Sequence, residues 1–142
     1  MPQQLLSPEI QAFATGFPLT LMHAGLTVLI LILGSGLYIL LTPHREIALI
    51  REGNAAAAIS LGGVMLGLAL PLAVSLKAST SAIEIGVWGI STVIVQLLVF
   101  RIVDLILRGL PQRIQEGEIA AATVLVGAKL ATAVILAAAV AG

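Results

Sequence analysis

The chain has 142 residues, of which 59% are hydrophobic and 10% charged, with no net charge at pH 7 and a mean hydropathy of +1.13. Soluble domains have about 45–50% apolar and about 25% charged residues, so this composition excludes a soluble globular protein. A neutral chain has no bulk field to attract nucleic acid, and a chain without cysteine has neither disulfides nor thiolate metal sites. We predict an integral membrane protein that binds no nucleic acid.

Four stretches are apolar and long enough to cross a bilayer as helices, since about 20 residues span the roughly 30 Å hydrocarbon layer. They lack the alternating pattern of barrel strands. We therefore predict an all-α polytopic membrane protein with transmembrane helices at about residues 18–41, 54–76, 82–107 and 118–141. Residues 1–17, which carry no Lys or Arg, are predicted to be an N-terminal segment and not a signal peptide.

The chain repeats itself at an interval of 64 residues. Residues 52–73 and 116–137 agree at 11 of 22 aligned positions, starting with Glu52-Gly53 and Glu116-Gly117. Asn54 follows the first glycine and Glu118 the second, and Lys129 replaces Met65. Internal repeats are common in transporters and channels. Within a single membrane domain, residues 1–142, we predict two parallel helical-hairpin repeats, at about 18–76 and 82–141.

Positive charge predicts the orientation, because cytoplasmic loops are enriched in Lys and Arg. One side of the predicted membrane carries only Lys77, whereas the other carries five arginines, namely Arg45, Arg51, Arg101, Arg108 and Arg113. Both hairpin loops are therefore expected in the cytoplasm and both termini outside. The first loop is either a solvated connector or a turn of interfacial helix.

Lys129 is predicted to lie near the middle of the bilayer, about 16 Å into the fourth span. A charge there costs roughly 2.5–3.5 kcal/mol and usually faces a partner or water. Gln96 is its expected partner by depth, and Glu84 and Thr92 extend a polar stripe along the same span. These four residues form a candidate intramembrane polar site. The alternative is a lysine that is structural, paired across a subunit interface or neutral.

Two further groups have structural interpretations. Arg101, Asp104 and Arg108 are expected to form a salt-bridged charge cluster at the inner end of the third span, where Asp104 lies too far in depth to pair directly with Lys129 unless the helices are offset. Small residues are expected at helix contacts, because they let two backbones approach closely. The predicted packing residues are Ser60, Gly63, Gly67 and Gly127.

The sequence Glu-Gly-Asn-Ala-Ala-Ala-Ala-Ile-Ser-Leu-Gly-Gly at residues 52–63, with Gly67, Pro71, Trp88-Gly89 and Glu116-Gly117, resembles the bacterial inner-membrane proteins grouped as domain of unknown function 350. The resemblance runs from about residue 18 to the end. It implies four spans with an internal duplication in the inner membrane, and an association with genes for envelope maintenance. It implies no activity, cofactor or catalytic residue.

These observations favour a structural or partner-binding component of an envelope maintenance or stress system, embedded in lipid as a homo-oligomer and with a possible envelope-stress protein as its partner. The alternative is an oligomeric ion channel or small-solute transporter with a polar path near Lys129 and Gln96. No enzymatic motif, metal site or cofactor is predicted.

Overall fold

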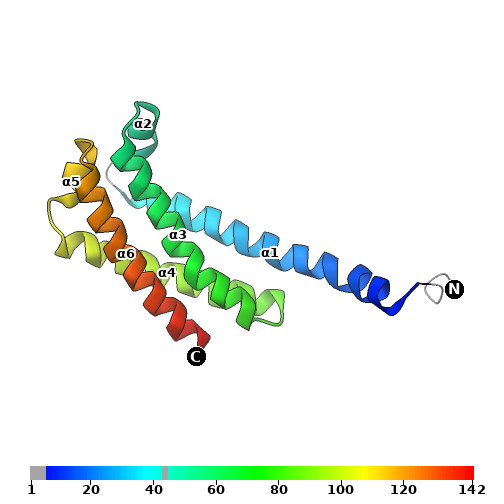
Figure 1. Cartoon of the computed structure of the whole chain (residues 1–142). Helices are drawn as coiled ribbons and strands as arrows, with labels where there is room; N and C mark the ends of the chain where they lie inside the picture. Colours follow the sequence, from blue (N-terminus) through cyan, green and yellow to red (C-terminus); the bar gives the residue numbers. More distant parts are fainter. Residues whose placement is uncertain (1–5, 43–44) are drawn as a thin grey trace.

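The computed structural model describes residues 6–42 and 45–142, and within them it is all-helical (Figure 1). Four long helices are long and apolar enough to cross a membrane, which confirms the all-α, four-span prediction. Two six-residue helices lie in the loops between them. In chain order the elements are α1 (Pro8–Leu41), α2 (Glu46–Arg51), α3 (Ala55–Ala78), α4 (Ala82–Ile106), α5 (Leu110–Gln115) and α6 (Ile119–Ala141).

Helix α1 begins ten residues earlier than predicted, at Pro8 instead of about residue 18. Ser7 caps it by accepting a hydrogen bond from the amide of Ile10, and proline at the first helical position is already held in a helical φ. The predicted N-terminal segment is therefore helical from residue 8, and residues 1–5 lie outside the described part. At 34 residues α1 is about 51 Å long, well beyond the roughly 30 Å hydrocarbon layer.

The bundle is built around α3 and α6, which make the most extensive contact of any helix pair in the described residues. They run side by side in the same direction, and α1 and α4 pack behind them (Figure 1). The first half of α1 extends away from the bundle toward the N-terminus, and residues 8–22 are all exposed. α1 therefore contributes only its second half to the core.

The Glu-Gly pairs of the repeat motif end the two short helices, whose starting residues Glu46 and Leu110 are 64 positions apart. Each glycine adopts a left-handed conformation, with φ of +88° at Gly53 and +86° at Gly117, which a side chain would strain. In both turns the amide after the glycine donates to the carbonyl five residues earlier: Asn54 to Leu49 at 2.9 Å, and Glu118 to Arg113 at 3.0 Å. These are the bonds of a Schellman motif, so the repeated pair is a helix terminator.

The residues that follow the two glycines, Asn54 and Glu118, make different contacts. Asn54 caps α3 by accepting from the amide of Ala57 at 3.0 Å, and its own amide donates to the carbonyls of Ile114 and Gln115, both at 3.1 Å. It thereby ties the start of α3 to the end of α5. Glu118 makes no capping bond and instead accepts from Arg113, whose hydrogen bond lowers the pKa of Glu118.

Two of the predicted packing glycines lie at close helix contacts. A Cβ at Gly63 would sit 2.5 Å from Val126 on α6, and a Cβ at Gly67 would sit 2.6 Å from the ring of Phe100 on α4. Ser60 is buried on the same side of α3. The expectation for Gly127 is wrong: a Cβ there would meet nothing within 4 Å. α3 thus supplies the small residues, and the matching position of α6 turns away from the contact.

Replacing Gly63 with alanine should destabilise the protein by about 1–3 kcal/mol, because Val126 is β-branched and cannot turn away from the added methyl. Gly62 is the matched control, since a Cβ there meets nothing within 4 Å and alanine is the better helix former. Thermal unfolding in detergent should show a lower Tm for Gly63→Ala and an equal or higher Tm for Gly62→Ala. Equal melting of both variants would place the helix contact elsewhere.

Candidate functional site

The charged groups of the interior gather at the end of the bundle that carries α2 and α5, which we call the α2/α5 end. Lys129 of α6 is 1% exposed, and its Nζ lies 2.9 Å from Oδ1 of Asp104 on α4. Asp104 Oδ1 accepts no well-directed hydrogen bond, so the contact is one of charge against charge. A buried ammonium is tolerated only when it is neutralised, and Asp104 supplies the opposite charge within the same chain.

Helix α1 and the aromatic rings complete the surroundings of the lysine. Its Nζ donates a hydrogen bond of 3.3 Å to the hydroxyl of Tyr38. The same nitrogen lies 5.1 Å from the centre of the Tyr38 ring and 5.5 Å from that of Phe100, within the range of cation–π attraction. Lys129 therefore links α6 to both α4 and α1.

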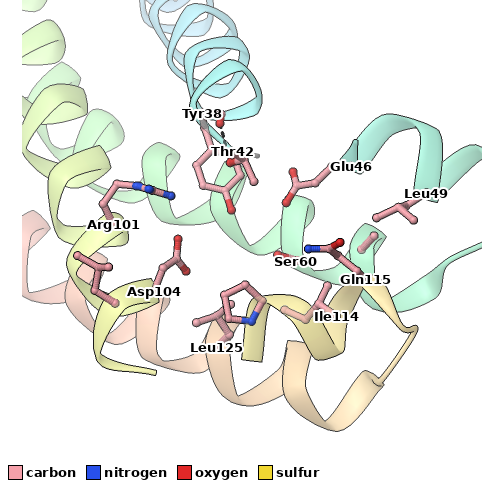
Figure 2. A pocket seen from close by; sticks show the side chains of 13 residues that line it. Tyr38, Thr42, Glu46, Leu49, Ser60, Arg101, Asp104, Ile114, Gln115 and Leu125 are labelled. Carbon is pink, nitrogen blue, oxygen red and sulfur yellow. Dashed lines mark hydrogen bonds between the residues drawn. The ribbon is translucent and has the colours of Figure 1, made fainter. Parts of the chain in front are cut away.

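A cavity of about 190 Å³ lies beside this ion pair (Figure 2). Buried Glu46 and Ser60 face it, together with the partly buried Asp104. Figure 2 shows the side chains of Tyr38, Asp104 and Glu46 directed toward one another across the space. Exposed Arg101 and Gln115 lie at its rim. The apolar part of the wall includes Leu49, Leu105, Ile114 and Leu125.

Glu46 is the least satisfied of these groups. The residue is 3% exposed, and its Oε2 has no hydrogen-bond partner among the described residues. Burial raises the pKa of Glu46 to about 7, and the charge of Asp104 adds to the shift. The charge of Lys129 and a hydrogen bond from Tyr38 oppose the shift. Glu46 belongs to the short helix α2, outside the four long helices. Because its pKa is about 7, a small change in its surroundings would change its protonation near neutral pH.

The expected partner of Lys129 is wrong. Gln96 is completely buried, but its amide donates to Thr132 at 3.2 Å, and its Oε1 has no partner among the described residues. Lys129 instead forms an ion pair with Asp104 and a hydrogen bond with Tyr38. Pairing by depth assumes that side chains stay at the level of their Cα atoms. Side chains on a helix tilt toward its N-terminus, which for α6 is the α2/α5 end. The long lysine therefore reaches back along α6 to Asp104, near the end of α4.

The remaining members of the predicted polar site lie apart from this cluster. Glu84 sits at the start of α4 and accepts from the amide and hydroxyl of Thr80, at 2.7 and 3.1 Å. Thr92 is buried and donates to the carbonyl of Trp88 at 2.6 Å, one turn earlier in the same helix. The four candidate residues do not meet in one site.

The inner-end charge cluster also differs from the expectation. Asp104 pairs with Lys129, whereas Arg101 and Arg108 are exposed and make no ion pair within the described part of the chain. Arg101 lines the cavity, and Arg108 does not. Asp104 faces inward because the interior contains a cation, while the two arginines can extend toward water or headgroups at the membrane boundary.

Sequence reasoning missed Tyr38 and Glu46. Tyr38 is the single tyrosine of the chain and stands alone in an apolar run, which is a usable signal for a polar contact inside the bundle. Glu46 gave no such signal, because a glutamate in a short loop is usually solvated. Its burial depends on how α2 packs against α3 at this end of the bundle, which no local pattern shows.

The comparisons with known proteins agree with a membrane protein. Residues 12–140 match the family described as Domain of Unknown Function (DUF350). The chain is 35% identical over 78 residues to UPF0719 inner membrane protein YjfL of Escherichia coli strain K12, and equally to that of strain O157:H7. The match covers 55% of this chain and 59% of each relative, so the chain spans little more than half of their length. No solved structure matches.

Lys129→Met should destabilise the protein by roughly 3–5 kcal/mol, because it leaves Asp104 as an uncompensated charge in the bundle. Met65, the equivalent residue in the first repeat, is 44% exposed, so its presence there does not make methionine suitable at the buried site. The double variant Lys129→Met/Asp104→Asn should recover much of the loss, since it removes both charges. A double variant no more stable in detergent than Lys129→Met would contradict the pairing.

Proposed function

The chain belongs to the Domain of Unknown Function (DUF350) family, and from this premise we propose that it is a structural, partner-binding component of the inner membrane, which acts as a homo-oligomer. The inner-membrane location follows from the four membrane-spanning helices and from the relative's name. Neither the family nor the relative supplies an activity. The proposal therefore rests on what this chain leaves exposed and what it encloses.

The first half of α1 carries the proposal. Residues 8–22 are all exposed on the part of α1 that extends away from the bundle (Figure 1), and Phe13 and Phe17 stack on each other with ring centres 4.8 Å apart. α4 starts at Ala82, the position that matches residue 18 at the 64-residue interval, so residues 8–17 have no counterpart in the second half. A helix that extends beyond both the bundle and the hydrocarbon layer needs another protein surface to pack against. We assign that surface to α1 of a second copy.

The arrangement of the two hairpins in the membrane is consistent with a structural, partner-binding role. We propose that the protein consists of two parallel hairpins, with both termini outside and the α2/α5 end in the cytoplasm, as the arginine distribution favours. α3 and α6 would form the rigid centre and α1 the association element. We also propose a place in an envelope-maintenance system, with an envelope-stress protein as partner, on the basis of the family's gene association.

The alternative, an oligomeric channel or transporter, has less support. In this alternative, ions or small solutes would pass along the polar stripe of Glu84, Thr92 and Gln96 toward Lys129. Glu84 and Thr92 bond within their own segment, and Lys129 is neutralised by Asp104. These contacts leave the charge of Lys129 without a role in attracting ions along that stripe.

Cysteine cross-linking tests the homo-oligomer. The chain has no cysteine, so a single introduced thiol reports on one site. Phe13→Cys in native membranes under mild oxidation should give a disulfide-linked dimer of this chain, because the proposal places this part of α1 against its copy. Leu40→Cys is the control on the same helix, 83% exposed but at the α2/α5 end, and should remain monomeric.

If Phe13→Cys stays monomeric, or cross-links no more than Leu40→Cys, α1 does not associate with itself through this segment. A cross-linked product of any mass other than twice the chain would equally contradict the homo-oligomer.

A further inference from the structure

The cavity at the α2/α5 end has an unbalanced charge. Glu46 and Asp104 contribute two carboxyl groups to its wall, and Lys129 beside it contributes one ammonium. Asp104 is paired with Lys129, whereas Oε2 of Glu46 is buried without a partner. The charge of Lys129 therefore acts on two carboxyl groups, and the ionised form of buried Glu46 is disfavoured unless a further cation is present. This position favours either a proton or a cationic ligand.

The rim of the same cavity has the opposite imbalance. Arg101 is exposed, lines the opening and makes no ion pair within the described residues. Guanidinium groups bind phosphate in two-pronged geometry, which gives both strength and orientation. The lining also includes the hydroxyl-bearing side chains of Tyr38, Thr42 and Ser60. The cavity lining thus combines an exposed guanidinium that can bind an anion, several hydroxyl groups and a buried carboxyl group that can bind a cation.

The geometry points to a binding site for a phosphoethanolamine headgroup, with its ammonium against Glu46 and its phosphate at Arg101. The volume of about 190 Å³ is well above the roughly 10–15 Å³ that a single water molecule needs on the same measure, so the cavity has room for a small headgroup. A ligand that carried only a cation would leave Arg101 unused, and one that carried only a phosphate would place it near two carboxyl groups. A zwitterion matches both ends.

The position of the cavity favours a lipid as the source of the headgroup. Arg101 and Asp104 lie in the last turns of α4 and Thr42 at the end of α1, where the membrane spans finish. Leu105 at the rim is 60% exposed and offers an apolar surface beside the opening, as the first carbons of an acyl chain require. This site is independent of the homo-oligomer proposed above, since it uses none of the exposed half of α1.

The protonation of Glu46 should control binding. The titratable or charged groups that face it among the described residues are Tyr38 of α1, Arg101 and Asp104 of α4, and Lys129 of α6, while α3 and α5 contribute the neutral Ser60 and Gln115. Because burial raises its pKa to about 7, Glu46 is protonated below that pH and ionised above it. An ammonium ligand needs the ionised form, so binding should strengthen as the pH rises through the pKa of Glu46.

Native mass spectrometry tests the site in protein released from vesicles of equal parts phosphatidylethanolamine and phosphatidylcholine. The parent should retain phosphatidylethanolamine roughly tenfold over phosphatidylcholine, because only a primary ammonium donates hydrogen bonds to the carboxylate. Glu46→Gln keeps the size of the side chain and should abolish the preference. Arg101→Gln should reduce retention of both lipids, and the control Arg108→Gln, whose side chain does not line the cavity, should behave as the parent.

Two further arms complete the experiment. The parent's preference should be weaker at about pH 5 than at about pH 8, and Glu46→Gln should show no such change. Added soluble phosphoethanolamine that displaces the lipid would make the headgroup alone the ligand, while retained lipid would assign the site to the bilayer. A parent without preference, or a preference that survives in Glu46→Gln, overturns the site.

Discussion

A positive charge inside a membrane protein has to be neutralised by a neighbour, and Lys129 meets that need with Asp104, 2.9 Å away. The pair joins α6 to α4, and the bond from Lys129 to Tyr38 adds α1. Neither α1 nor α3 adds a charge to this pair: α1 supplies the hydroxyl of Tyr38, and α3 supplies glycines that let α6 and α4 approach. The ion pair between Lys129 and Asp104 therefore holds the helices together where they carry polar groups. The glycines of α3 allow close packing where the helix backbones meet.

This arrangement separates a rigid part of the molecule from two parts with unused binding capacity. The helix termini at the α2/α5 end are closed by Schellman turns and by the bonds from Asn54 to the end of α5, so the two loops hold each other. Against that fixed end stands the exposed half of α1, which finds no partner helix among the described residues. The second part with unused binding capacity is the cavity beside Glu46, because Oε2 of Glu46 is buried and has no hydrogen-bond partner among the described residues. We assign association with a second copy to the exposed half of α1 and ligand binding to the cavity.

The sequence was sufficient for the features that depend on local pattern. Apolar length predicted the four spans, and the small size of Gly63 and Gly67 predicted close contacts. Features that depend on three-dimensional direction were not predictable: which way α6 turns Gly127, how far the Lys129 side chain reaches toward the helix N-terminus, and how α2 buries Glu46. The start of α1 at Pro8 was also missed, although Ser7-Pro8-Glu9 is a recognisable helix start, because the continuous apolar run begins only about ten residues after this cap.

Solid-state NMR of the protein in lipid bilayers measures the central ion pair directly. Asp104 is the only aspartate of the chain, and Lys129 shares its residue type only with Lys77, which is exposed at the end of α3. Labelling the aspartate carboxyl carbon with ¹³C and the lysine Nζ with ¹⁵N therefore isolates one pair. A strong dipolar coupling between the two labels, at hydrogen-bonding range, is the predicted result. A spectrum without that coupling would show that Lys129 is neutralised in another way, and it would contradict an interior held together by the pair with Asp104.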